Sequence, residues 1–342
     1  MTEWPQILVI YTGGTIGMIE DPDSKVLHPF DFEHLSLEIP ELKKLNCSVE
    51  TITLGDPVDS SNMSPEIWVD IASIIEEKYH QYDGFVILHG SDTMAYTASA
   101  LSFMLENLAK PVILTGSQLP IGMIRTDGKE NFLTAVEIAA AKRADGTPRV
   151  PEVCVYFEYK LYRGNRTYKR SADNFEAFES PNFPVLAEAG VHIKYNDSLV
   201  LQPVDANLIV RKHMDCSIGI VYLFPGIHKQ MMEAVLLNPD LKAVIIHTYG
   251  AGNAPTTGWF LDLLRQASDQ GKVLVNLTQC TTGSVDQGRY STGREMLQIG
   301  VIGGRDMTLE TTVTKLMYLL GVGFDNEEIK RYLGQPLRGE LS

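Results

Sequence analysis

The chain has 342 residues, of which 44% are hydrophobic and 21% charged, as in an ordinary globular protein. Its formal net charge of -14 predicts repulsion from phosphate backbones and anionic lipid, so we expect neither nucleic acid nor membrane surfaces as partners. No apolar stretch approaches the ~20 residues that span a bilayer, and the first residues lack the pattern of a secretory signal.

The first half of the chain alternates short apolar runs with longer amphipathic segments, which is typical of β–α–β units around a mainly parallel sheet. Ser64 as an N-cap, followed by Pro65 at the first helical position, marks the start of one helix. In chain order we predict strand 6–11, strand 49–54, helix 64–79, strand 85–88, a helix ending near 108, strand 111–114, helix 128–142 and strand 153–157.

The same rhythm restarts after residues 196–213, a segment with polar breaks and Pro203 that we interpret as a linker. We therefore expect an α/β protein with a larger N-terminal catalytic domain, residues 1–195, built on a parallel sheet. A smaller flavodoxin-like domain should cover 214–342. Its predicted elements are strands 217–223, 243–247 and 273–277 with helices between them, then helices 308–320 and 326–333.

Four short polar motifs follow predicted strands, and in open parallel sheets ligands bind beyond the carboxyl ends of the strands. The motifs cover residues 12–15, 59–62, 90–93 and 115–118. They are rich in hydroxyls and carboxylates, which suits nucleophilic acyl transfer on a small polar substrate. The four cysteines are widely spaced without a CxxC pair, so we expect reduced thiols, a cytoplasmic location and no metal or cofactor.

Each motif also has a structural interpretation. The glycine turn before Thr15 could be a tight connection, and it fits neither the dinucleotide nor the P-loop pattern. Ser91 and Asp92 could cap the following helix, and Lys169 could be a solvated surface group. His89 and His247, at strand ends, are interpreted as packed or hydrogen-bonded structural residues.

Taken together the motifs resemble the bacterial-type L-asparaginase family, most closely its cytoplasmic type I branch. The resemblance extends over nearly the whole chain. It is carried, in the same order, by residues 11–18, 59–63, 84–118, 161–167, 249–255, 300–304 and 337–341. It implies hydrolysis of L-asparagine to L-aspartate and ammonia through a threonine nucleophile and an acyl-enzyme.

The resemblance also implies roles for single residues. Thr15 matches the nucleophile, and Ser91 stands at the usual threonine of a second catalytic cluster that positions water. Asp92 matches the acid that also binds the substrate's α-ammonium, and Lys169 matches the lysine of the same cluster. Since serine lacks the β-methyl of threonine, we expect activity with a rate cost.

Substrate binding is implied for a loop and for a neighbouring subunit. Asp59, Ser60 and Ser61 match the loop that holds the α-carboxylate and α-amino groups, together with Ser91 and Asp92. Asn253 matches a position that reaches the site from a neighbouring subunit, which implies a homodimer or a dimer of dimers.

Two further departures from the family pattern affect regulation and activation. Residues 20–30 contain no counterpart of the usual activating tyrosine, and Tyr290 is our candidate replacement hydroxyl. Some type I enzymes are activated by asparagine at a second site that uses an arginine and a cysteine. Here Cys280 is at the cysteine position, but His247 replaces the arginine and Tyr168 a smaller residue, so we expect weakened or absent allostery.

Other functions remain open on the sequence alone. One is a related amidohydrolase that prefers glutamine or a larger amide, such as the transamidation subunit that uses the same motifs. Another is a noncatalytic flavodoxin-like binding module whose glycine-rich turns hold phosphate.

Overall fold

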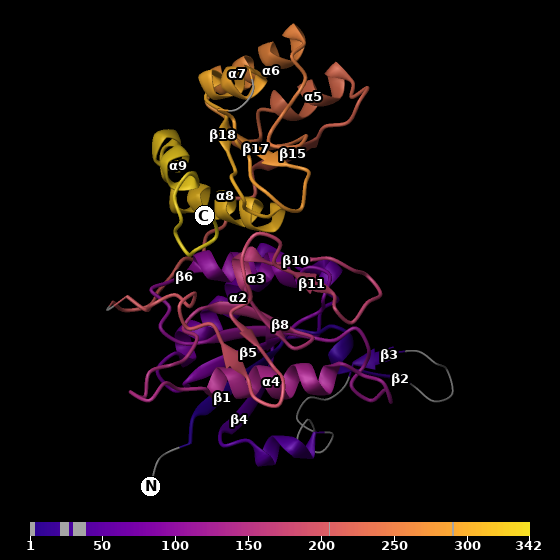
Figure 1. Cartoon of the computed structure of the whole chain (residues 1–342), viewed down its shortest axis with the longest axis vertical. Coiled ribbons are helices and arrows are strands. Elements are labelled where there is room, and N and C mark those ends of the chain that lie inside the picture. Colours follow the sequence, from indigo (N-terminus) through magenta and orange to yellow (C-terminus); the bar gives the residue numbers. More distant parts are fainter. Residues whose placement is uncertain (1–3, 21–26, 30–38, 205, 289–290) are drawn as a thin grey trace. The chain divides into compact units, whose positions relative to one another are not determined.

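The computed structural model describes residues 4–20, 27–29, 39–204, 206–288 and 291–342. It divides into two compact units, Met1–Lys212 and His213–Ser342 (Figure 1). Within the segment 196–213 that we interpret as a linker, β14 (Ile209–Val210) pairs with β6 (Leu105–Glu106) and so belongs to the first unit.

The first unit is built on one eight-stranded sheet, in which five neighbouring strands are parallel. These five are β4 (Ser48–Thr53), β1 (Gln6–Tyr11), β5 (Gly84–Leu88), β7 (Val112–Thr115) and β8 (Val153–Phe157). Beyond β8 the sheet continues with the antiparallel strands β9 (Lys160–Arg163), β12 (Ala187–Glu188) and β13 (Lys194–Tyr195). The five predicted strands are the five parallel ones.

Helices cover the two faces of this sheet. In Figure 1, α4 (Gly128–Ala140) lies on one side of the strands, and α2 (Pro65–Lys78) and α3 (Met94–Met104) lie on the other. Because successive strand residues point to opposite faces, Ile7 and Val9 pack with Phe132 of α4 in one core cluster. Burial of each such side chain contributes about 1.5–3 kcal/mol of hydrophobic stabilisation.

Short elements complete the first unit at the ends of the main strands. They are the 3₁₀ turns η1 (Thr15–Gly17), η3 (Pro40–Lys44), η4 (Ser60–Asn62) and η5 (Gly164–Arg166), the pair β2 (Met18–Glu20) and β3 (Leu27–Pro29), and the pair β10 (Tyr168–Lys169) and β11 (Phe178–Glu179). Helix α3 ends four residues before the predicted end near 108, because the chain turns into β6 and pairs with β14.

The second unit has its own four-stranded parallel sheet, with its strands in sequential order. The strands are β15 (Ile218–Tyr222), β16 (Ala243–Thr248), β17 (Val273–Thr278) and β18 (Ile302–Gly303). The helices are α5 (Lys229–Leu236), α6 (Gly258–Asp269), α7 (Ser291–Ile299), α8 (Leu309–Val322) and α9 (Asn326–Leu333). The predicted α/β class, with a larger first and a smaller second parallel-sheet domain, is confirmed.

A buried ion pair joins the parallel strands to the antiparallel extension. Arg163 on β9 donates from Nε to Glu152 Oε2 at 2.7 Å, and both side chains are 5% exposed. Arg163 also donates to the carbonyl of Leu199, while Glu152 accepts from the amide of Leu201. The pair therefore connects the last parallel strand, β9 and the chain near residue 200.

The four cysteines are free and differ in exposure between the units. Cys47 and Cys154 in the first unit are buried, whereas Cys216 and Cys280 in the second are exposed. In the described part of the chain, no helix has the length and apolarity needed to cross a membrane.

Candidate active site

Three loops meet at the carboxyl ends of β1, β4 and β5, and glycines let their backbones touch. A Cβ on Gly14 would lie 2.5 Å from the Cα of Gly90, and one on Gly13 would lie 2.2 Å from the carbonyl oxygen of Val58. Gly13 and Gly14 also have positive φ, of 124° and 88°. Only glycine fits both requirements. The contact between Gly14 and Gly90 brings Thr15 and Ser91, the next residues of the two loops, into one region.

Thr15 opens the 3₁₀ turn η1 and is half-buried. The loop before it is fixed by main-chain hydrogen bonds, from the amide of Thr12 to the carbonyl of Leu88 and from the amide of Val58 to the carbonyl of Thr12. The glycine turn is therefore a tight connection, and it places Thr15 just beyond the carboxyl end of β1.

The loop after β4 presents an ordered carboxylate. Asp59 Oδ1 accepts hydrogen bonds from the amide and the hydroxyl of Ser61, both at 2.9 Å. These bonds lower the pKa of the Asp59 carboxyl, which is exposed. Ser60 between them is buried, and its Oγ would lie 2.5 Å from a Cβ on Gly90, so this loop adjoins the Ser91 loop directly.

Ser91, Asp92 and Lys169 form a hydrogen-bonded cluster. Lys169 Nζ donates to Asp92 Oδ1 at 2.6 Å and to Ser91 Oγ at 2.9 Å. The Lys169 side chain is 18% exposed although it carries a charge, whereas Asp92 is 63% exposed. The alternative that Lys169 is a solvated surface group is wrong, because its side chain is mostly buried and bonds to both Ser91 and Asp92.

Capping is not the role of Ser91 or Asp92. Helix α3 begins at Met94 with Thr93 at the N-cap position, and the Thr93 side chain makes no capping hydrogen bond. Thr93 instead donates its hydroxyl to the carbonyl of Ser60 at 2.7 Å. The two polar side chains before it are therefore available to the Lys169 cluster.

His89 is a structural residue, as we interpreted it from the sequence. It is fully buried, with Nδ1 2.6 Å from the carbonyl of Gly90 and Nε2 2.8 Å from Oγ1 of Thr97. The carbonyl partner requires a proton on Nδ1, so neutral Nε2 accepts from Thr97. Burial lowers the pKa of His89 to about 4 against a smaller opposing effect of the Gly90 hydrogen bond, which keeps the ring neutral.

Comparisons with known proteins identify the family. The sequence model described as "Asparaginase, N-terminal" matches residues 6–201, and that described as "Glutaminase/Asparaginase C-terminal domain" matches residues 217–333. The chain belongs to the asparaginase family.

Individual relatives match this chain over nearly their full length. The chain is 48% identical over 337 residues to L-asparaginase 1 of Escherichia coli, covering 98% of each chain. The crystal structure of L-asparaginase I from Vibrio cholerae superposes with a TM-score of 0.90 at 41% identity, covering 99% of each chain. The thermostable L-asparaginase from Thermococcus kodakarensis gives a TM-score of 0.89 at 32% identity.

One polar residue of this asparaginase-family site was not singled out by sequence reasoning. Gln118, at the end of β7, accepts a hydrogen bond from the Ser91 hydroxyl at 3.1 Å. Its motif, residues 115–118, is one of the four at strand ends, but no sequence feature indicates a role for the side-chain amide. The available signal was its place after β7, because β7 is the sheet neighbour of β5.

The remaining predicted residues lie in the second unit or outside the described chain. Asn253 lies just after β16, where its main chain exchanges hydrogen bonds with Tyr249. His247 is buried against the Tyr222 ring, with centroids 5.3 Å apart, and its ring nitrogens have no hydrogen-bond partner in the described part of the chain. Cys280 follows β17, and Tyr290 lies outside the described residues.

Tyr168, the third residue of the predicted regulatory set, is in the first unit. It lies on β10 beside Lys169, and its hydroxyl donates to Glu179 on β11 at 3.3 Å.

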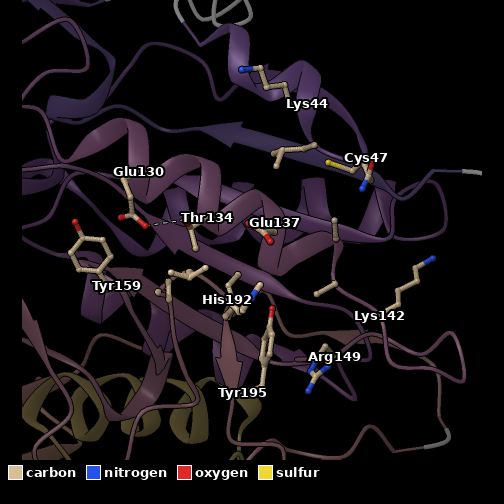
Figure 2. A pocket seen from close by; sticks show the side chains of 18 residues that line it. Lys44, Cys47, Glu130, Thr134, Glu137, Lys142, Arg149, Tyr159, His192 and Tyr195 are labelled. Atoms are coloured by element: carbon tan, nitrogen blue, oxygen red, sulfur yellow. Dashed lines mark hydrogen bonds between the residues drawn. The ribbon is translucent and has the colours of Figure 1, made fainter.

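A groove of about 990 Å³ in the first unit contains none of the predicted site residues. Figure 2 shows Thr134 and Glu137 of α4 facing it, with His192 and Tyr195 beside them. Cys47 in its wall directly precedes β4, so the groove lies at the amino end of that strand. Ligands of open parallel sheets bind at the opposite ends of the strands.

Among the described residues no cluster of His, Cys, Asp and Glu could hold a metal ion.

Proposed function

We propose that this chain hydrolyses L-asparagine to L-aspartate and ammonia, with Thr15 as nucleophile and an acyl-enzyme intermediate. One observation carries the proposal: the hydrogen-bonded Lys169, Ser91 and Asp92 cluster joins the Thr15 loop through the contact between Gly14 and Gly90. The L-asparaginases among the relatives, one of them 48% identical, support the substrate.

The proposed chemistry needs a nucleophile, a route for its proton and a stabilised oxyanion. Thr15 Oγ attacks the side-chain amide carbon, and its proton passes to the leaving nitrogen, which departs as ammonia. The resulting ester is then attacked by water, whose proton returns to Thr15 as aspartate leaves. Ser91 and Lys169 are suited to position that water and carry protons, because a hydroxyl and an ammonium lie 2.9 Å apart.

Recognition of the amino-acid head group is proposed for the carboxylates and hydroxyls around the cluster. Asp59 and Asp92 supply negative charge for the α-ammonium, and Ser60 and Ser61 supply hydroxyls for the α-carboxylate. An aspartate is already ionised at neutral pH, and the Ser61 hydrogen bonds lower the pKa of Asp59 further. Paired recognition discriminates against amides without an amino-acid head group, because they leave polar groups unpaired.

The assembly is proposed to be a homodimer or a dimer of dimers, with Asn253 of one subunit reaching the site of another. An apolar face supports it: Ile220, Tyr222 and Phe224 are exposed on or next to β15 and alternate with buried Val221 and Leu223. Monomeric proteins rarely expose such contiguous patches.

We also propose that the enzyme is cytoplasmic, since four free cysteines suit a reducing compartment.

The test is ammonia release from L-asparagine and from L-glutamine by wild type, Thr15→Ser and Thr15→Ala. We expect asparagine to be preferred, Thr15→Ser to keep part of the activity, and Thr15→Ala to lose at least about a thousandfold in kcat. Mass spectrometry of rapidly quenched enzyme should detect the acyl adduct on Thr15. Full activity in Thr15→Ala would contradict the nucleophile.

The same assay separates the other functions. A preference for glutamine points to the related amidohydrolase, and inactivity on both amides combined with nucleotide binding points to the binding module.

We expect a hyperbolic dependence of rate on asparagine concentration, because His247 replaces the arginine of the regulatory site. A sigmoidal curve contradicts that expectation.

A further inference from the structure

The side-chain amide of Gln118 connects three parts of the site. Its Oε1 accepts from the Ser91 hydroxyl at 3.1 Å. Its Nε2 donates to the carbonyls of Ala172 and Asn174, at 3.3 and 3.1 Å. These two carbonyls belong to the loop between β10 and β11, and β10 carries Lys169. The amide therefore lies between Ser91 and the hairpin that carries its lysine partner.

The two carbonyls determine which way the amide faces. Carbonyl oxygens only accept hydrogen bonds, so the NH₂ group must point toward Ala172 and Asn174. The opposite orientation would place three oxygens against one another and leave the NH₂ donors facing Ser91. Oε1 is thereby directed at the Ser91 hydroxyl.

This orientation fixes the hydrogen of Ser91. Lys169 Nζ is only a donor when charged and contacts Ser91 Oγ at 2.9 Å, so Ser91 accepts there and donates to Gln118. A hydroxyl that donates to one partner and accepts from another has a single direction for its proton and its lone pairs. Its side chain is also held in one of the three staggered rotamers.

The main chain of Gln118 is itself firmly held. Its main-chain N–H donates to both carboxyl oxygens of Asp127, at 3.1 and 3.0 Å, and Asp127 is buried. Asn131 on α4 also donates to Asp127, at 3.2 Å. The acceptor offered to Ser91 is thus fixed relative to the core of the first unit.

We propose that Gln118 is a positioning residue that fixes the rotamer and proton direction of Ser91. The inference rests on the proposed function, in which Ser91 helps position water. A serine needs such a partner more than a threonine does, because a β-branched side chain is already restricted at χ1. The hydrogen bond to Gln118 thereby restricts the χ1 rotamer of Ser91, as the β-methyl group would restrict that of a threonine.

The experiment combines Gln118→Met, which keeps the length but removes both kinds of hydrogen bond, with Ser91→Thr. We expect Gln118→Met to lower kcat about three- to tenfold while KM stays within about twofold, because Ser91 loses its hydrogen bond to Gln118 and its rotamers are freed. In the Ser91→Thr background the same change should cost less than about twofold.

Ser171→Ala is the matched control for mere loosening of the loop. Ser171 Oγ accepts from the amides of Asp173 and Asn174 in the loop that Gln118 contacts, but no hydrogen bond links it to Ser91. We expect this variant to keep kcat within about twofold. Equal losses from Gln118→Met in both backgrounds, or the same loss in Ser171→Ala, would overturn the inference.

A crystal structure of Gln118→Met gives a readout that does not depend on activity. Ser91 spread over more than one rotamer supports the inference, and an unchanged single rotamer overturns it. If wild type releases no ammonia from asparagine, the proposed function fails while this structural test still decides the role of Gln118. If Thr15→Ala is inactive but Gln118→Met retains full kcat, only the inference fails.

Discussion

At the scale of single residues, the buried network around His89 supports the loop that carries Ser91. Thr97 Oγ1 accepts from the Trp68 indole at 2.9 Å and donates to His89, which in turn donates to the carbonyl of Gly90. Protonation of His89 would put a second donor against the Thr97 hydroxyl and a charge into the core. The network therefore holds only while the imidazole is neutral.

The low pKa of His89 predicts a loss of stability in acid. Unfolded, the ring titrates near 6.5, whereas in the folded protein burial lowers its pKa to about 4. Between these values only the unfolded chain takes up the proton, so stability falls as pH falls through the window. From this residue alone, urea unfolding should give about 2 kcal/mol less stability near pH 5 than near pH 7.

Two histidine variants test the assignment. His89→Gln should flatten the dependence of unfolding free energy on pH, while His80→Gln, at an exposed position, should leave it as in wild type. An unchanged slope in His89→Gln would show that other groups cause the acid sensitivity.

Much of the candidate site can be predicted from residues because its chemistry sits in short motifs at strand ends. The place of Ser91 and Asp92 after β5 follows from the apolar run before them. The role of Gln118 cannot be predicted in this way, because it depends on the orientation of the side-chain amide. Carbonyls more than fifty residues later in the chain determine that orientation. Hydrogen-bond direction across such distances has no local sequence signal.

At the scale of elements, the antiparallel extension of the first sheet depends on a buried charge pair. Arg163 on β9 lies over the Phe183 ring at 4.4 Å and bonds Glu152, which immediately precedes β8. Burial of these charges away from water is costly unless both are present. The pair therefore makes the attachment of β9 to β8 sensitive to loss of either side chain.

Removal of one partner should destabilise the first unit strongly. Arg163→Met leaves Glu152 charged and buried, for which we expect a loss of about 3–5 kcal/mol in the free energy of unfolding. The control is Arg149→Met, since Arg149 pairs with Asp197 at 2.8 Å in a more exposed setting, with side chains 33% and 52% exposed. That variant should lose no more than about 1 kcal/mol. Similar losses in chemical denaturation would refute the distinction.

Strands β1, β5, β7 and β8 could be predicted because each is a nearly continuous apolar run buried on both faces. Strands β12 and β13 have only two residues each, which is too short for a periodic pattern. Their pairing is decided by tertiary contacts around β9. Helix α3 ends before its predicted end for a related reason, because β6 pairs with β14, about a hundred residues away.

At the scale of the whole molecule, the chain combines a net charge of -14 with an apolar face on the edge strand β15. The charge favours solubility, whereas the exposed Ile220, Tyr222 and Phe224 favour association. We therefore expect this face to be covered by a second copy of the chain.

Phe224→Asp should therefore weaken self-association. We expect wild type to sediment as a dimer or tetramer at micromolar concentration, and the variant to shift toward monomer by about tenfold or more in Kd. Val191→Asp, which changes a fully exposed apolar residue of the first unit, is the control and should leave the assembly unchanged. A monomeric wild type, or an unaffected Phe224→Asp assembly, rules out this face.

The distribution of thiols between the units has a practical consequence for following the protein in solution. A maleimide or mass tag added to the folded chain reacts first at the exposed thiols of Cys216 and Cys280, since Cys154 is fully enclosed and Cys47 is 7% exposed. Burial also raises the pKa of the enclosed thiols, which reduces their reactive thiolate fraction. Labelling of Cys154 thus marks the opening of the first unit, so the native chain carries its own reporter of unfolding in that unit.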